Sequence, residues 1–203
     1  MVNEKNTAKE WNKYWQKVQD SFLANLYRTI FLAKPVAKLI DLYFGKKGIF
    51  VEAGSGSSAT SKYIKKRNRK IIAMDFSEKA LILAKQQKNV DEVKLGDIKK
   101  MPFKKESLDG IWNLGVMEHF SKPEINEILQ EFHRTLKKNG KIILLWPAKY
   151  NIVNNIMPWM FPAMPSELKS RKEGKSILKK NKFKSITTKV TVMGDIILVG
   201  KKI

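Results

Sequence analysis

The chain has 203 residues, of which 43% are hydrophobic, which is enough for one folded domain with a substantial core and argues against disorder of the whole chain. Forty basic residues against nineteen acidic ones give a net charge of +21, a value that attracts nucleic acid or anionic membrane surfaces without proving either partner. No cysteine is present, which excludes disulfides, thiolate metal sites and cysteine nucleophiles and favours a reducing, cytoplasmic setting.

The N-terminal segment is expected to be helical. Its first sixteen residues lack the apolar core of a signal peptide, and no apolar run approaches the 18 residues of a spanning helix. Apolar and aromatic residues recur at helical spacing over 9–44, which predicts two helices interrupted near Pro35. We interpret 1–45 as a helical cap on a single domain whose cofactor-binding core spans 46–146.

The core alternates between two kinds of pattern. Three amphipathic stretches predict helices at Ser61–Arg67, Glu78–Lys88 and Pro123–Lys138, the last ending at Asn139-Gly140. Strands that alternate with helices indicate an α/β fold with a parallel sheet and helices on both of its faces. Five short apolar runs predict the buried strands, at residues 48–54, 70–76, 93–97, 108–115 and 140–147.

The C-terminal part follows a different pattern. Residues 147–166 hold four prolines and little charge, which predicts a loop or short-helix insertion over the substrate. Within 167–203 we expect a helix followed by two strands, because 183–202 alternate with period two and turn at Gly194-Asp195. This strand pair should be antiparallel, in a sheet that is otherwise parallel.

The stretch "VEAGSGSSAT" places Gly54 and Gly56 directly after the first predicted strand. Glycines there allow a ligand to approach the backbone and permit positive φ, and with Ala59 they fit a dinucleotide fingerprint. Asp75 ends the second strand 21 residues after Gly54, where a carboxylate can bind a ribose diol. The alternative is that Asp75 only caps the helix beginning near Ser77.

Three features favour S-adenosylmethionine over a nicotinamide as the ligand. Glu52 precedes the turn, where a carboxylate would repel a pyrophosphate but support a cationic sulfonium. Asp97 follows the third strand, within reach of an adenine amino group. The antiparallel terminal pair is more typical of methyltransferases than of dehydrogenases, which leaves a dehydrogenase as the third choice.

Four stretches in order, "VEAGSGSS", "AMDFSEKAL", "VKLGDIKKMPFKKESLDGIWNLGVMEHF" and "LKKNGKIILLWP", resemble class I S-adenosylmethionine-dependent methyltransferases. The resemblance is to the methyltransferase type 11 group, which includes ubiquinone and menaquinone methylases, and it covers about half the chain. It implies a Rossmann-like sheet of seven strands with the last one antiparallel. S-adenosylmethionine would be the cofactor and S-adenosylhomocysteine the product.

The resemblance also implies roles for residues near the glycine turn. Glu52, Gly54 and Gly56 would line the methionine end of the cofactor. Asp75 would hold the ribose, and Phe76 would flank the adenine.

Further along the chain, Asp97 and Ile98 would contact the adenine edge. Asn113 and Leu114, which end the fourth strand, would face the reacting centre, so Asn113 is a candidate catalytic residue. Ser58 stands where many relatives have a third glycine, and this departure affects the fine geometry of the turn.

A base is needed only if the acceptor must lose a proton. The motif "MEHF" offers Glu118 and His119 just after the fourth strand, and His119 is the candidate base because of its ordinary pKa. A packing role for His119 is an equal alternative, and His133, in the middle of a helix, is assigned to structure. With two histidines and no neighbouring ligands, no metal site is expected.

The acceptor is expected to be a small, apolar or lipid-like molecule. Nucleic-acid methylases resemble one another in a proline-containing motif after the fourth strand, and residues 113–116 contain no proline. Two aromatic and methionine-rich segments are candidate lids, with Trp11, Tyr14, Trp15, Tyr150, Met157, Trp159, Met160, Phe161 and Met164. These residues could instead simply pack the two segments together.

Two other interpretations remain open. The basic stretch 169–184 could contact lipid headgroups or phosphates, although a solvated helix face explains it as well. The positive charge would then favour a membrane-bound acceptor. The runner-up function is a noncatalytic RNA- or membrane-binding protein that uses the methyltransferase fold, and an RNA methyltransferase is a further alternative.

Overall fold

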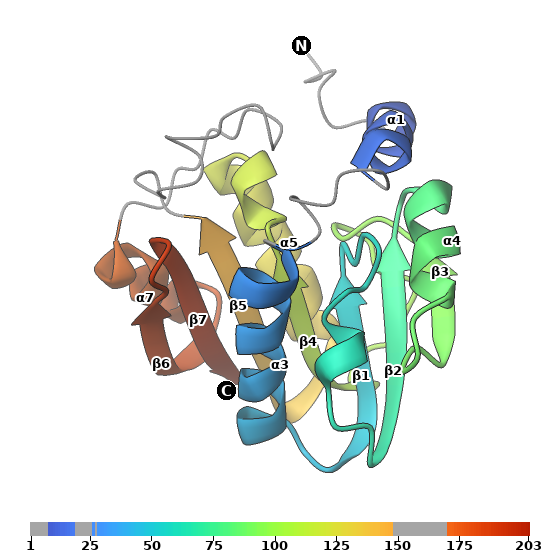
Figure 1. Ribbon diagram of the computed structural model, residues 1–203. Coiled ribbons are helices and arrows are strands. Elements are labelled where there is room, and N and C mark those ends of the chain that lie inside the picture. Colours follow the sequence, from blue (N-terminus) through green and yellow to red (C-terminus); the bar gives the residue numbers. More distant parts are fainter. Residues whose placement is uncertain (1–7, 19–25, 27, 148–169) are drawn as a thin grey trace.

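A computed structural model describes residues 8–18, 26, 28–147 and 170–203, which build a seven-stranded sheet with the order β3-β2-β1-β4-β5-β7-β6 (Figure 1). The strand β7 runs antiparallel to both of its neighbours, and the other neighbouring strands pair in parallel. The predicted α/β fold is therefore confirmed. The strands are β1 (Lys47–Ala53), β2 (Asn68–Asp75), β3 (Glu92–Leu95), β4 (Leu108–Leu114), β5 (Leu136–Pro147), β6 (Phe183–Val190) and β7 (Asp195–Lys202).

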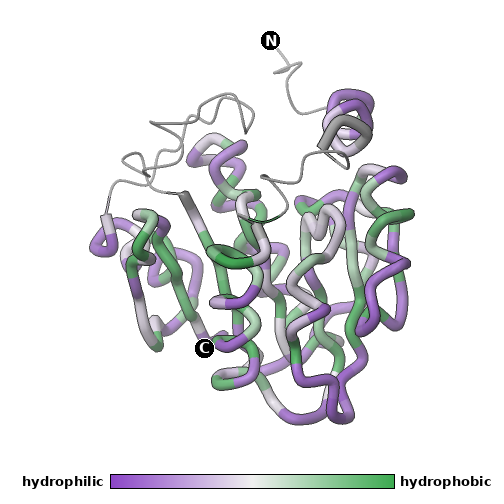
Figure 2. The backbone as a smooth tube through the Cα atoms, in the orientation of Figure 1, coloured by the Kyte–Doolittle hydropathy of each residue, from purple (hydrophilic) through white to green (hydrophobic). Residues whose placement is uncertain are grey.

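Helices cover both faces of this sheet. On one face α5 and α7 share a hydrophobic cluster with Val51, Ile111 and Leu144, whereas α3 packs on the other face against Phe50 and Trp112. Figure 2 shows hydrophobic residues along the central strands, as expected for strands that are buried on both faces. The α-helices are α1 (Ala8–Val18), α3 (Lys34–Tyr43), α4 (Glu78–Lys85), α5 (Lys122–Thr135) and α7 (Arg171–Lys180).

Three short helical segments of other types complete the described elements. A π-helix, η2 (Arg28–Ala33), leads directly into α3, and Pro35 lies in the first turn of α3, where a missing N–H costs nothing. The 3₁₀ turns η3 (Ser61–Tyr63) and η4 (Met117–His119) follow β1 and β4. The predicted insertion lies outside the described residues from position 148 onward, and so do its six candidate lid side chains.

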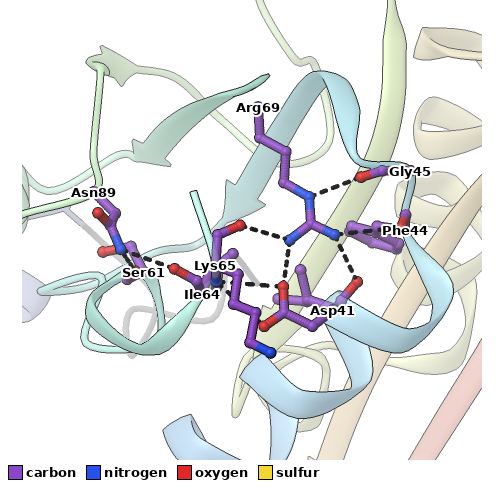
Figure 3. Close-up of polar contacts among 9 residues, drawn as sticks. Asp41, Phe44, Gly45, Ser61, Ile64, Lys65, Arg69 and Asn89 are labelled. Atoms are coloured by element: carbon purple, nitrogen blue, oxygen red, sulfur yellow. Dashed lines mark hydrogen bonds and ion pairs between the residues drawn. The ribbon is translucent and has the colours of Figure 1, made fainter. Parts of the chain in front are cut away.

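The helix predicted over Ser61–Arg67 is wrong, because only the 3₁₀ turn forms there. The backbone groups that a helix would use are bound elsewhere (Figure 3). The side-chain amide of Asn89 donates to the carbonyls of Ser61 and Ile64, each at 2.9 Å. The N–H of Lys65 donates to Asp41 and its carbonyl accepts from Arg69.

Arg69 is the centre of this network, with a side chain that is fully buried. Its guanidinium donates to Asp41 at 2.5 Å and to the carbonyl of Gly45 at 2.7 Å (Figure 3). Further bonds reach the carbonyls of Ile40, Phe44 and Lys65. The positive charge thus satisfies carbonyls at the C-terminal end of α3 and ties that end to the start of β2.

The boundary between α5 and β5 also differs from prediction. The helix begins as expected, at a capping box of Ser121 and Glu124, but it ends at Thr135 instead of Lys138. Leu136 pairs with Leu108 of β4, and the carbonyl of Thr135 accepts the N–H of Ser107 at 2.9 Å. Pairing with the neighbouring strand therefore overrides the local helical pattern.

The C-terminal segment matches its predicted form. The helix α7 precedes a β6–β7 hairpin whose turn contains Gly194 at φ +91°. In the described part of the chain, no helix combines the length and the hydropathy needed to span a bilayer.

Candidate functional site

The glycine turn leaves β1 with positive φ at Gly54 (+68°) and Gly56 (+51°). Side chains could not be added at either position. A Cβ on Gly54 would lie 2.8 Å from Val116, and one on Gly56 would lie 2.1 Å from the ring of Trp15. The turn is thus bare backbone at the carboxyl edge of the sheet, as predicted, and neighbouring side chains already touch it.

Asp75, the last residue of β2, holds this turn in place. One carboxylate oxygen accepts the N–H of Gly56 at 2.8 Å, and the other accepts the N–H of Ser77 at 2.9 Å. The side chain is almost fully buried, and burial raises the pKa of the Asp75 carboxyl while these N–H donors oppose the rise. The helix α4 is capped by Ser77 and not by Asp75, because the Ser77 hydroxyl accepts the N–H of Ala80.

Glu52 lies beneath the turn, within β1, and is 3% exposed. Burial raises the pKa of Glu52 to about 7, and a hydrogen bond from Ser58 opposes the rise. The Ser58 hydroxyl donates to the carboxylate at 2.5 Å. Ser58 itself has φ +51°, a conformation that favours glycine. A serine at this position is therefore in a strained backbone conformation, but its hydroxyl gives Glu52 a hydrogen-bond donor that a glycine would lack.

The predicted adenine-side residues surround the end of β2. Phe76 is half-buried. The N–H of Gly96 donates to the carbonyl of Asp75, which brings the β3 loop to the same edge. Asp97 is exposed, and its carboxylate accepts the N–H of Lys99 at 2.8 Å. The side chain of Ile98 packs into the core.

The end of β4 carries buried polar groups without partners. Asn113 is fully buried, and within the part of the chain that the structure describes neither atom of its amide has a hydrogen-bond partner. The same holds for both oxygens of Glu118, which is also fully buried. Burial raises the pKa of Glu118 to about 8, and the charge of Asp195 adds to the rise. Leu114, between the two, is half-buried.

His119 lies at the end of η4, half-buried against an aromatic neighbour. Its ring meets that of Trp11 edge-on, with centroids 4.9 Å apart. Burial lowers the pKa of His119 to about 4, so the imidazole is neutral at pH 7. His133 instead packs edge-on against Phe183, away from the site. Among the described residues, no group of three potential metal-ligating side chains comes together.

The helix α1 lies across the same edge (Figure 1). The side-chain carbonyl of Asn12 accepts the hydroxyl of Ser77 at 2.6 Å and the N–H of Lys79 at 3.3 Å. Trp15 contacts Gly56. The aromatic spacing pointed to Trp11 and Trp15, but no pattern in the sequence indicated Asn12 or the bond from Ser58 to Glu52.

The comparisons with known proteins agree on one family. The family model for the methyltransferase domain matches residues 51–144. An uncharacterized methyltransferase of Schizosaccharomyces pombe is 36% identical over 112 residues, which are 54% of this chain and 41% of that protein. The malonyl-[acyl-carrier protein] O-methyltransferase of Yersinia pestis is 27% identical over 95 residues, which are 47% of this chain and 35% of that enzyme. The chain thus spans less than half the length of these curated relatives.

A solved structure shows the same fold. The magnesium protoporphyrin IX methyltransferase of Synechocystis, solved with bound S-adenosylhomocysteine, superimposes with a TM-score of 0.73. The match covers 100% of this chain and 98% of that one at 16% sequence identity.

Proposed function

We propose that the chain is a class I S-adenosylmethionine-dependent methyltransferase domain and that it transfers a methyl group from S-adenosylmethionine to a small acceptor. The observation that carries the proposal is the bare turn of Gly54 and Gly56, held by Asp75 and underlain by Glu52. Two buried carboxyl groups next to a turn without side chains suit a ligand that is both positively charged and bulky.

The residues present fit this cofactor. Gly54 and Gly56 would let it approach the backbone, and Glu52 would face its charged end. Asp75 accepts the N–H of Gly56 on one oxygen and that of Ser77 on the other, and its remaining lone-pair capacity would bind the ribose hydroxyls. The adenine would contact Phe76, Asp97 and the backbone of Ile98.

Bound S-adenosylmethionine supplies an electrophilic methyl group on a sulfonium. The chain has to align an acceptor with that group, and alignment alone contributes several kcal/mol to rate acceleration. Asn113 can orient the acceptor because its buried amide has no other partner among the described residues. A hydroxyl or amine acceptor loses a proton as the new bond forms, and His119 is the proposed base. Burial lowers the pKa of His119 to about 4, so the imidazole is neutral but is a weaker base than its ordinary pKa would make it.

We propose that the acceptor is small and apolar or lipid-like. The aromatic face of Trp11 next to His119 supports this class, because it lines the approach to the fourth strand with apolar surface. The Yersinia pestis relative, by its name, methylates a malonyl group on a carrier protein. Recovery of a labelled methyl group in lipid extract and not in RNA would support this class over an RNA substrate.

Calorimetry tests the cofactor proposal directly. The wild-type chain should bind S-adenosylmethionine with a dissociation constant in about the micromolar range. Asp75→Asn should weaken binding at least about tenfold, because it removes a charge-assisted hydrogen bond. Asp109→Asn is the matched control, since Asp109 also accepts a backbone N–H, that of Ile49, but at the opposite edge of the sheet. It should leave the affinity unchanged.

Two results would contradict the proposal. Equal affinities of wild type and Asp75→Asn would remove the ribose assignment. Absence of binding to both S-adenosylmethionine and S-adenosylhomocysteine would instead favour the noncatalytic alternative, a protein that binds RNA or membrane through its basic faces.

A further inference from the structure

The helix α1 touches three elements of the proposed cofactor site at once. Asn12 binds the start of α4 through Ser77 and Lys79. Trp11 packs on His119, beyond β4, and Trp15 packs on Gly56, beyond β1. A single helix of eleven residues therefore spans the carboxyl ends of the strands that carry the site (Figure 1).

The contact of Trp15 with Gly56 matters most, because it occupies the space that the missing side chain leaves. A Cβ on Gly56 would lie 2.1 Å from Cζ2 and 2.4 Å from Cη2 of the indole. Non-bonded carbon atoms need a separation of about 3.5–4.0 Å. No ligand atom can therefore lie between the indole and the backbone of Gly56 in this arrangement.

The helix is attached at this edge through side chains at its surface. Its side chains Trp11, Asn12, Tyr14 and Trp15 are half-buried, not enclosed. Isolated helices of this length are marginal in water, so α1 depends on its docking for stability. Two polar contacts, one of them at 3.3 Å, hold Asn12 in place.

We propose that α1 is a gate of the cofactor site and that Trp15 is its gating residue. The indole leaves Gly56 when S-adenosylmethionine binds, and it returns when the product leaves. This inference rests on the proposed function. It adds that the docked position of α1 competes with the cofactor, so the observed affinity is reduced by the fraction of molecules in which the gate is closed.

The test compares wild type with Trp15→Ala in calorimetry with S-adenosylhomocysteine and S-adenosylmethionine. Removal of the indole should open the slot and tighten binding of both ligands by about 3- to 10-fold. Lys13→Ala is the matched control, because Lys13 is exposed on the same helix and its removal should leave the affinities unchanged. Fluorine NMR of 5-fluorotryptophan-labelled protein, with the Trp15 signal assigned through Trp15→Phe, should show that signal moving to a solvent-exposed position as ligand is added.

The possible outcomes separate the two proposals. Equal or weaker binding by Trp15→Ala, with wild type binding normally, would overturn the gate and leave the proposed function intact. Binding by Trp15→Ala alone would support a gate that is almost always closed. If neither protein binds either ligand, the proposed function fails and the gate fails with it.

Discussion

At the scale of single residues, the pair of Glu52 and Ser58 sets the electrostatics beneath the glycine turn. Many members of the resembled family have glycine where this chain has Ser58, and the positive φ there explains why glycine is common. Serine adopts the same conformation at a cost and compensates by donating to Glu52. Burial raises the pKa of the Glu52 carboxyl and the Ser58 bond opposes the rise, so the carboxyl titrates with a pKa of about 7.

This titration predicts that cofactor affinity depends on pH. A cationic ligand stabilises the ionised form of Glu52, so binding below pH 7 must release a proton. The dissociation constant for S-adenosylmethionine should therefore fall as pH rises from about 6 to 8, by up to about tenfold for one coupled proton. Calorimetry in buffers of different ionisation enthalpy would count the released proton.

Two variants sharpen this prediction. Glu52→Gln should abolish the proton release. Ser58→Ala removes the hydrogen bond that lowers the pKa of Glu52. The midpoint of the pH dependence of cofactor affinity should therefore move to higher pH. A pH-independent affinity in wild type would show that Glu52 does not sense the cofactor charge.

Glu118 is a second residue whose properties follow from burial. It was a candidate in "MEHF" only because it adjoins His119, yet it is the more deeply buried of the two. Its pKa of about 8 leaves it protonated at pH 7. Only the folded chain shows this, because burial depends on neighbours such as Asp195 that are distant in sequence.

At the scale of elements, the join between α3 and β2 depends on one buried cation. Arg69 has all its donors paired, and most of its acceptors are carbonyls at the end of α3. Arg69→Met should therefore destabilise the fold by about 3–5 kcal/mol, because it leaves Asp41 without its partner and several carbonyls unsatisfied. Chemical denaturation would measure this loss of unfolding free energy.

The matched control is the exposed ion pair of Lys70 with Glu92, where the Lys70 side chain is 51% exposed. Lys70→Met should cost less than about 1 kcal/mol because solvent screens the pair. A similar cost for both variants would mean that burial of Arg69 contributes little to this junction.

The same network shows why helix prediction failed after the glycine turn. Residues 61–67 have a pattern compatible with a helix, but Asn89, Asp41 and Arg69 bind their backbone groups. These partners lie about 20 to 30 positions away or belong to another element, so a local window cannot detect them. The end of α5 shifted for a related reason, since Leu136 pairs with β4.

At the scale of the whole molecule, the charge of +21 includes a run of exposed basic residues on α7 and the start of β6 as well as lysines elsewhere. Exposed lysines occur on several elements and loops, among them Lys62, Lys85, Lys105, Lys138 and Lys175. Such a distribution gives weak association with any polyanion, and this association is sensitive to salt.

We therefore predict that RNA binds this protein only through non-specific electrostatic attraction and is not the methyl acceptor. With methyl-labelled S-adenosylmethionine, the label should appear in a cellular lipid extract and be absent from total RNA at about 150 mM salt, where non-specific binding has weakened. The label in lipid should persist when salt is doubled, whereas retention of RNA on the protein should fall steeply. Label in RNA, insensitive to salt, would instead identify an RNA methyltransferase.

The sequence by itself determined the strand order along the chain, the bare turn at Gly54 and Gly56, and the acid at position 75, because each depends on local pattern or on backbone conformation. Tertiary structure alone decided that Trp15 covers Gly56, that Glu118 is sealed from water, and that residues 61–67 do not form a helix. Each of these depends on contacts between segments far apart in the chain, and the energies of such contacts are absent from any single stretch of residues.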